Sequence, residues 1–130
     1  MSHKIINTTG WIITLVLAFL FTYSAFPKIT LDASSVAMAT AVGFDESTWR
    51  LIGVVELVSL VLFIIPRTTL IGALLLIAYM GGAIATHLQH QQSVVVPIAV
   101  QVLVWVATAL RSPVLRRQFI PASHSFVQQH

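Results

Sequence analysis

Four long apolar stretches, separated by short polar segments, dominate this chain. They cover residues 10–26, 49–65, 69–87 and 94–110. A transmembrane helix needs about 17–25 mostly apolar residues. The pattern therefore predicts an all-α membrane protein built as a four-transmembrane-helix bundle, with residues 1–130 forming a single domain.

Prolines and glycines divide the predicted helices. Pro27 is expected to end the first helix, because the residue before a proline avoids helical backbone angles. Pro66 leaves only a short link between the second and third helices, which predicts an antiparallel hairpin. Gly81 and Gly82, near the end of the third helix, would let another helix backbone approach closely.

A shorter apolar segment, residues 32–43, lies between the first and second predicted spans. It is too short to cross a bilayer, and Asp32 and Gly43 have the chemistry of a helix start and a helix stop. We expect a short interfacial helix here, with a surface loop as the alternative. Asp45 follows it and is placed to cap the second span.

The composition supports a membrane location. The chain is 57% hydrophobic and 8% charged, whereas a soluble domain carries about 25% charged residues. Cysteine is absent, which excludes disulfides, thiolate catalysis and cysteine-ligated metals. The net charge of +3 is distributed at the predicted helix ends, so it indicates membrane orientation rather than nucleic-acid binding.

Four spans place both termini on one side of the membrane. That side carries Lys4, Arg67, Arg111, Arg116 and Arg117, and the opposite side carries Lys28 and Arg50. Loops rich in lysine and arginine stay in the cytoplasm, so we expect the N- and C-termini to be cytoplasmic.

Glu56 lies in the middle of the second span. A charged side chain at the centre of a bilayer costs roughly 2.5–3.5 kcal/mol, so this carboxylate needs a partner or a proton. Trp49, Gly53, Glu56, Leu60 and Phe63 follow helical spacing along one face. We expect this face to turn toward the interior of the bundle.

Other polar side chains fall near the level of this acid. At 1.5 Å per residue, the distance from Trp49 places Glu56 roughly 10 Å below the outer boundary. The candidate polar site comprises Glu56, Tyr79 and Gln101 at that depth, with Lys28, Arg50 and His87 above them. All six lie in the outer half, and the inner half offers no comparable polar group.

Each candidate also has a structural interpretation. Glu56 could serve only as an ion-paired link between helices, and Lys28 and Arg50 could be interfacial anchors. His87 and His90 lack a carboxylate at ligand spacing, so no metal site is predicted. We find no autonomous catalytic motif, since nucleophile elbows, phosphate loops and haem or flavin motifs are absent from the sequence.

Four short motifs carry a family resemblance. They are Phe26 to Lys28, Gly53 to Leu57, Pro66, and Gly81 to His87. In order and spacing, across residues 10–110, they resemble the DoxX-like family of small four-helix bacterial membrane proteins. Pro27 stands where that family more often has a small residue.

The resemblance implies a multi-pass protein of the bacterial inner (cytoplasmic) membrane, tied to respiratory and redox functions. Some relatives are quinone-linked oxidoreductase subunits, as in thiosulfate oxidation, and others associate with oxidative-stress partners. The shared polar positions of the family correspond to Lys28, Glu56 and His87. Any redox chemistry would require a diffusible quinone as cofactor or a partner subunit, within a membrane oxidoreductase.

Three functions remain open from the sequence. The first, which we favour, is an accessory or quinone-interacting membrane subunit. The second is a proton-coupled exporter of small hydrophobic molecules; the small multidrug transporters also have four helices and one buried glutamate, but theirs is in the first helix. The third is a structural or assembly protein without a ligand. The expected partners are the lipid bilayer and either a redox subunit or a second copy in a homo-oligomer, with no nucleic acid.

Overall fold

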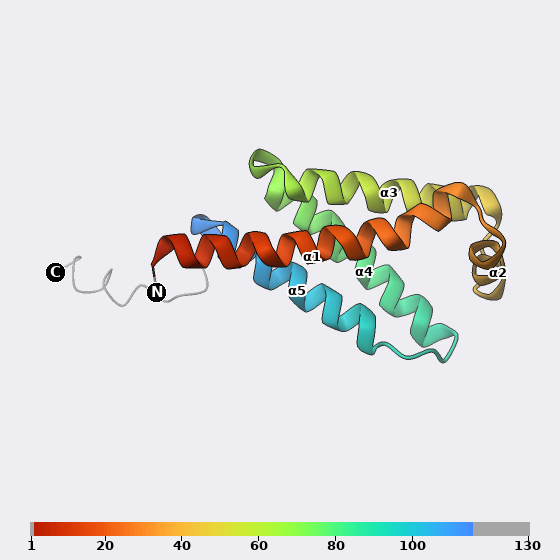
Figure 1. The fold of residues 1–130 in the computed structure, drawn as a ribbon. Coiled ribbons are helices and arrows are strands. Elements are labelled where there is room, and N and C mark those ends of the chain that lie inside the picture. Colours follow the sequence, from red (N-terminus) through yellow and green to blue (C-terminus); the bar gives the residue numbers. More distant parts are fainter. Residues whose placement is uncertain (1, 116–130) are drawn as a thin grey trace.

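The computed structural model describes residues 2–115, and this range is helical with no strands. The elements are α1 (His3–Thr30), α2 (Ala33–Ala41), α3 (Glu46–Ile64), the short 3-10 turn η1 (Pro66–Thr68), α4 (Thr69–Gln89) and α5 (Val95–Arg111). Figure 1 shows the four long helices running lengthwise, with α2 across one end and the start of α1 near the end of α5 at the other. Arg116 and Arg117, part of the predicted charge asymmetry, lie outside the described residues.

The four long helices form a ring in which each packs on two neighbours. Helix α1 contacts α3 and α5, and α4 contacts the same two helices. Apolar side chains fill the space between them: Leu17, Phe21, Leu60, Phe63, Ala73, Leu76, Met80, Val104 and Ala107. A polar side chain that reaches the middle of the ring can therefore contact the diagonally opposite helix as well as the two neighbouring ones.

Helix α1 does not end at Pro27, and that prediction was wrong. It continues to Thr30 and closes at Leu31, whose left-handed backbone (φ 57°) directs its N–H to the Pro27 carbonyl oxygen at 2.9 Å. A proline inside a membrane helix removes one backbone hydrogen bond, which neighbouring groups can compensate. Here the extra turn is held by the side chain of Lys28, which is anchored inside the bundle. Figure 1 shows α1 turning toward α3 over this segment.

The predicted short helix between the first two spans is confirmed as α2, Ala33–Ala41. Asp32 caps it by accepting a hydrogen bond from the backbone N–H of Ser35 at 2.8 Å. Gly43 follows with a φ of 83°, a backbone conformation that glycine adopts without strain. Asp45 caps α3 in the same way, through the N–H of Thr48 at 2.8 Å.

The expectation that Gly81 and Gly82 bring two helices together is wrong for the described chain. A Cβ atom built on either would meet no atom within 4 Å. The close approach occurs instead at Gly72, where a Cβ would overlap the backbone of Phe63. Gly72 thus allows α3 and α4 to close into the predicted hairpin.

The outer faces of the helices are apolar. Three segments are long and apolar enough to cross a membrane, namely His3–Thr30, Glu46–Ile64 and Pro66–Gln89, and Val95–Arg111 is a shorter apolar helix. Large side chains on these faces are well exposed, including Phe19 at 70% and Val95 at 71%. Burying such faces in water-free surroundings is favourable, so the helices indicate contact with the lipid bilayer.

Candidate functional site

An ion pair between α1 and α3 lies at the α2 end of the bundle. Lys28 Nζ is 3.4 Å from Glu56 Oε2 and 3.5 Å from Glu56 Oε1. The side chain of Glu56 is 0% exposed and that of Lys28 is 11% exposed. A buried carboxylate would be costly alone, so the lysine of the extra α1 turn supplies the partner that the sequence demanded.

The sequence positions Glu56 through the inward face of α3. Trp49, Gly53, Glu56, Leu60 and Phe63 are all buried, which confirms the predicted face. A Cβ atom on Gly53 would lie 2.8 Å from Lys28 Cβ. The missing side chain therefore lets α1 approach α3 at the level where the two charges meet.

Ser24 completes the ion pair and was not predicted from the sequence. Its hydroxyl donates to Glu56 Oε2 at 3.2 Å and accepts from Lys28 Nζ at 2.7 Å. The Ser24 carbonyl oxygen also accepts from Lys28 Nζ, at 3.2 Å. Its spacing of four residues before Lys28 puts both on one helix face, and that spacing was the signal that could have identified it.

Two aromatic residues surround the lysine. Lys28 Nζ donates to the Tyr79 hydroxyl oxygen at 3.2 Å and lies 5.4 Å from the centre of the Trp49 ring. Trp49 in turn donates its Nε1 proton to the Ser35 hydroxyl of α2 at 2.6 Å, in a buried hydrogen bond. The charged pair is thus connected to α4 through Tyr79 and to α2 through Trp49.

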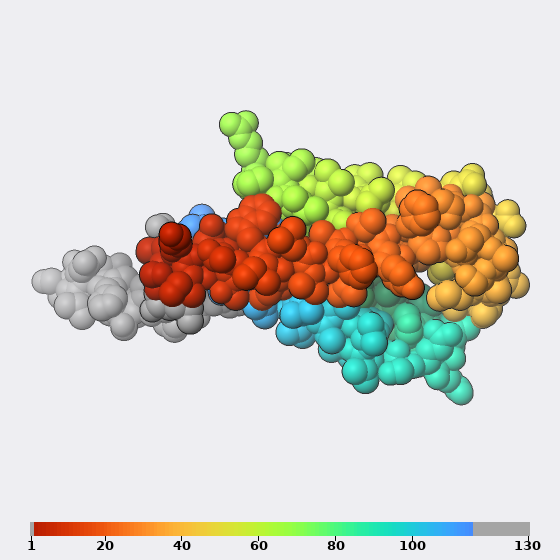
Figure 2. All heavy atoms as spheres, in the orientation of Figure 1, coloured from red at the N-terminus to blue at the C-terminus, as the bar shows by residue number. Residues whose placement is uncertain are grey.

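A cavity of about 760 Å³ opens beside the ion pair. Its polar lining consists of Ser24, Lys28, Glu56, Tyr79, Thr86, His87, Gln92 and Ser93. The apolar lining includes Leu20, Phe21, Met38, Trp49, Ile52, Met80, Val96 and Val100. Figure 2 shows the surface hollowed where α1, the α2 end and the α4–α5 end meet. A mostly apolar cavity of this size with a few polar groups is typical of a small-molecule site.

His87 lines the same cavity from the last turn of α4. Its Nδ1 atom lies 2.6 Å from the Ala83 carbonyl oxygen. A carbonyl oxygen only accepts hydrogen bonds, so Nδ1 carries the proton, and in the neutral ring Nε2 is an acceptor. Lys28, Glu56, Tyr79 and His87 therefore share one cavity.

Arg50 and Gln101 do not join this group. Arg50 is exposed, and its Nε donates to the Ile29 carbonyl oxygen at 3.1 Å. Gln101 is half-buried in α5, and neither residue is among those that line the cavity. Depth alone placed these two side chains at the right level but did not determine their direction around the helix.

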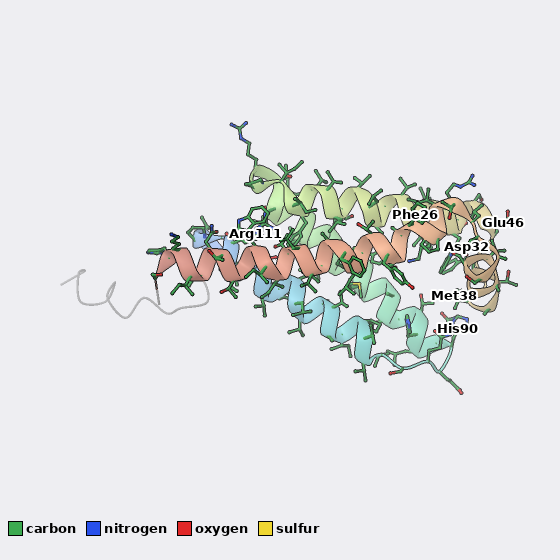
Figure 3. The ribbon with its side chains drawn as sticks, in the orientation of Figure 1. Phe26, Asp32, Met38, Glu46, His90 and Arg111 are labelled. Atoms are coloured by element: carbon green, nitrogen blue, oxygen red, sulfur yellow. The ribbon has the colours of Figure 1, made fainter. Side chains whose placement is uncertain are left out.

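The inner half of the bundle is not free of polar groups, contrary to the expectation. The Arg111 guanidinium donates to the carbonyl oxygens of Phe63 and Ile64, both at 3.0 Å, and to the hydroxyls of Thr14 and Thr69. It also stacks 3.9 Å from the centre of the Trp11 ring. Figure 3 shows Arg111 at the end of the bundle remote from Asp32 and Met38. Arg111 thus caps the C-terminal end of α3, whose last carbonyls have no helical donor.

No cluster of three or more histidine, cysteine, aspartate or glutamate side chains able to hold a metal occurs within residues 2–115. The side chains beside the cavity can donate and accept hydrogen bonds. The polar groups lie at one corner of the cavity, and apolar side chains form most of the remaining lining.

Comparison with known proteins adds one finding. Residues 12–109 match the model of the DoxX-like family. No curated protein and no solved structure matches the chain. The matched range includes the ion pair, the cavity and His87.

Proposed function

The chain belongs to the DoxX-like family, and we propose that it is an accessory membrane subunit that binds a quinone-type molecule beside the Lys28–Glu56 pair. In this proposal α1, α3, α4 and α5 cross a bacterial inner membrane as one domain, with both termini in the cytoplasm. The cavity then lies in the outer half of the bilayer. Its site residues are Lys28, Glu56, Tyr79 and His87, together with Ser24.

The observation that carries the proposal is the position of the cavity. A buried ion pair with Ser24 and Tyr79 forms one corner of an otherwise mainly apolar chamber of about 760 Å³. Drug-sized ligands occupy sites of roughly 300–1,000 Å³. A ring with polar oxygens and an apolar tail matches both kinds of lining.

The polar groups fit the two oxygens of a quinone ring. Lys28, Ser24 and Tyr79 carry N–H or O–H protons that a ring carbonyl can accept. His87 Nε2 provides an acceptor elsewhere in the cavity, suited to the hydroxyl of a reduced ring. The apolar tail would lie along Phe21 of α1 and Val100 of the neighbouring helix α5.

The exporter alternative has less support. A proton-coupled exporter needs an acid that exchanges protons as substrate passes, and Glu56 is instead paired with Lys28 and Ser24 at 3.2–3.5 Å. Both carboxylate oxygens already accept hydrogen bonds inside the bundle, so the geometry is that of a fixed ion pair between α1 and α3. A purely structural role stays the alternative that a binding experiment tests.

The direct test is purification in a mild detergent, followed by mass spectrometry of the co-purifying lipids. Recovery of a quinone from the wild-type protein, and its loss from a Lys28→Met variant, would support the proposal. An Arg67→Met variant is the control, because Arg67 is exposed in η1 and remote from the lining residues. Equal recovery from all three proteins would contradict the proposed site.

A further inference from the structure

We propose that Glu56 is a specificity-determining residue, which cancels the charge of Lys28 so that the cavity takes neutral amphipathic molecules and excludes anionic ones. The inference rests on the proposed function in that it concerns the same cavity. It adds the class of head group: a neutral hydrogen-bond acceptor, such as a ketone, amide or quinone, and not a carboxylate such as that of a fatty acid.

The charges that line the cavity compensate each other. Among the described residues that line it, Lys28 and Glu56 carry the formal charges, one positive and one negative. Both carboxylate oxygens of Glu56 accept from Lys28 Nζ, and Oε2 also accepts from Ser24. The formal charges of the lysine and the glutamate in the lining therefore sum to zero.

An anionic ligand would find no cation free to receive it. To reach Lys28 it must approach Glu56, and like charges in apolar surroundings repel strongly. Arg50, a second cation at this end of the bundle, donates to the Ile29 carbonyl oxygen and does not line the cavity. Arg111 is engaged at the opposite end of the bundle.

A neutral acceptor meets no such penalty. Lys28 Nζ has several oxygen acceptors within 3.5 Å, namely those of Ser24, Glu56 and Tyr79. Because its three protons already serve these oxygens, a ligand carbonyl oxygen would replace Ser24 or Tyr79 as an acceptor while Glu56 stays in place as the counter-charge. The ion pair therefore provides a polar corner that binds dipoles and rejects anions.

The test uses two ligands that differ only in the head group, decanoate and decanamide. Each is titrated calorimetrically into the purified full-length protein in a neutral detergent at about pH 8, where decanoate is ionised. The wild-type protein is expected to bind decanamide at least about tenfold more tightly than decanoate, which corresponds to about 1.4 kcal/mol. In Glu56→Gln, the uncompensated Lys28 is expected to reverse this order.

Two further proteins control the experiment. Glu46→Gln changes the net charge equally at an exposed position outside the cavity, and it should keep the wild-type preference. The double variant Lys28→Gln/Glu56→Gln has no charge at the site and should also prefer decanamide, which keeps the test available if Glu56→Gln does not fold.

The outcomes separate the two proposals. Wild-type protein that binds decanamide and decanoate equally would overturn the charge selection and leave the binding function intact. Glu56→Gln that folds and gains no affinity for decanoate would also overturn it. If the wild-type protein binds neither decanamide nor a short-chain quinone, the proposed function itself is overturned.

Discussion

Lys28 bonds to Tyr79 across the diagonal of the bundle. Their side chains meet at 3.2 Å, although within the described residues α1 and α4 do not pack directly against each other. Arg111 crosses the other diagonal at the opposite end, from α5 to the Phe63 and Ile64 carbonyl oxygens of α3. At each end, one cation therefore ties together two helices that are not neighbours: the buried Lys28 at one end and the half-buried Arg111 at the other.

The ion pair should be much more costly to break than to replace. We expect Lys28→Gln or Glu56→Gln alone to lower the free energy of unfolding by about 3–5 kcal/mol, because each leaves the other charge buried without its partner. The double variant should recover a large part of that loss. Unfolding in mixed detergent micelles measures all three; strictly additive losses would contradict the coupling.

The close approach of α1 to α3 depends on Gly53. A Cβ atom there would meet Lys28 Cβ at 2.8 Å and the Ala25 carbonyl oxygen at 3.1 Å. Gly53→Ala should therefore destabilise the protein by about 1–3 kcal/mol through overpacking. Gly81→Ala is the matched control in α4, where the Cβ meets nothing and the change should be neutral or slightly stabilising. Equal melting temperatures for the two variants would show that the helices are not in close contact at Gly53.

Arg111 should act through its planar, forked side chain. Arg111→Lys keeps the charge but loses the ability to reach the Phe63 and Ile64 carbonyl oxygens together. We expect a loss of about 1.5–3 kcal/mol in unfolding free energy, the range for hydrogen bonds to a charged group. Arg67→Lys, at an exposed position, should have little effect. An Arg111→Lys variant as stable as wild type would show that these hydrogen bonds do not stabilise the fold.

Asp45 should make the stability of α3 depend on pH in acid. Hydrogen bonds from the side chain and backbone N–H of Thr48 lower the pKa of Asp45 below its usual value. A carboxyl group with a lowered folded-state pKa contributes stability above its unfolded pKa, near 3.8. That contribution is lost as the pH falls through the lower folded value. Asp45→Ala should thus have a lower melting temperature than wild type at neutral pH, whereas Asp45→Asn should keep most of the cap. In strong acid the difference in melting temperature between Asp45→Ala and wild type should narrow.

The proposed topology can be tested because the chain has no cysteine. Single cysteines at Ser47, in the first turn of α3, and at Arg67, in η1 just after α3, would lie at opposite ends of that helix. An impermeant thiol reagent added to intact cells should label Ser47→Cys and leave Arg67→Cys unlabelled. The reverse pattern would place the cavity on the cytoplasmic side.

Much of the fold follows from short-range signals in the sequence. The apolar stretches, the Asp32 and Asp45 caps and the inward face of α3 all follow from local spacing, and the structure has each of them. Pro27 misled the prediction because a local preference was overridden by the tertiary anchoring of Lys28. Local signals therefore give the helices, and contacts between helices set where α1 ends.

The site was predictable only in part for a related reason. A buried Glu56 requires a partner, and the predicted depths brought Lys28 and Tyr79 within reach of it. In the structure Lys28 pairs with Glu56, and Tyr79 accepts a hydrogen bond from Lys28. Rotation around each helix separates Arg50 and Gln101 from the cavity, and depth carries no information about rotation. The contacts of Arg111 were not predicted, because an arginine at the end of a helix looks the same in the sequence whether it faces water or reaches the end of a neighbouring helix, here α3.

The most direct test is to follow tryptophan fluorescence while a short-chain benzoquinone is titrated into the purified protein, because Trp49 lines the cavity. Saturable quenching is predicted for wild type and for Ala85→Phe, because Ala85 is exposed and outside the cavity. Ala83→Phe should lose the saturable quenching, because Ala83 lines the cavity and the added ring would project into it. Quenching that rises without saturation, or that is the same in all three proteins, would contradict a quinone-binding cavity at Lys28 and Glu56.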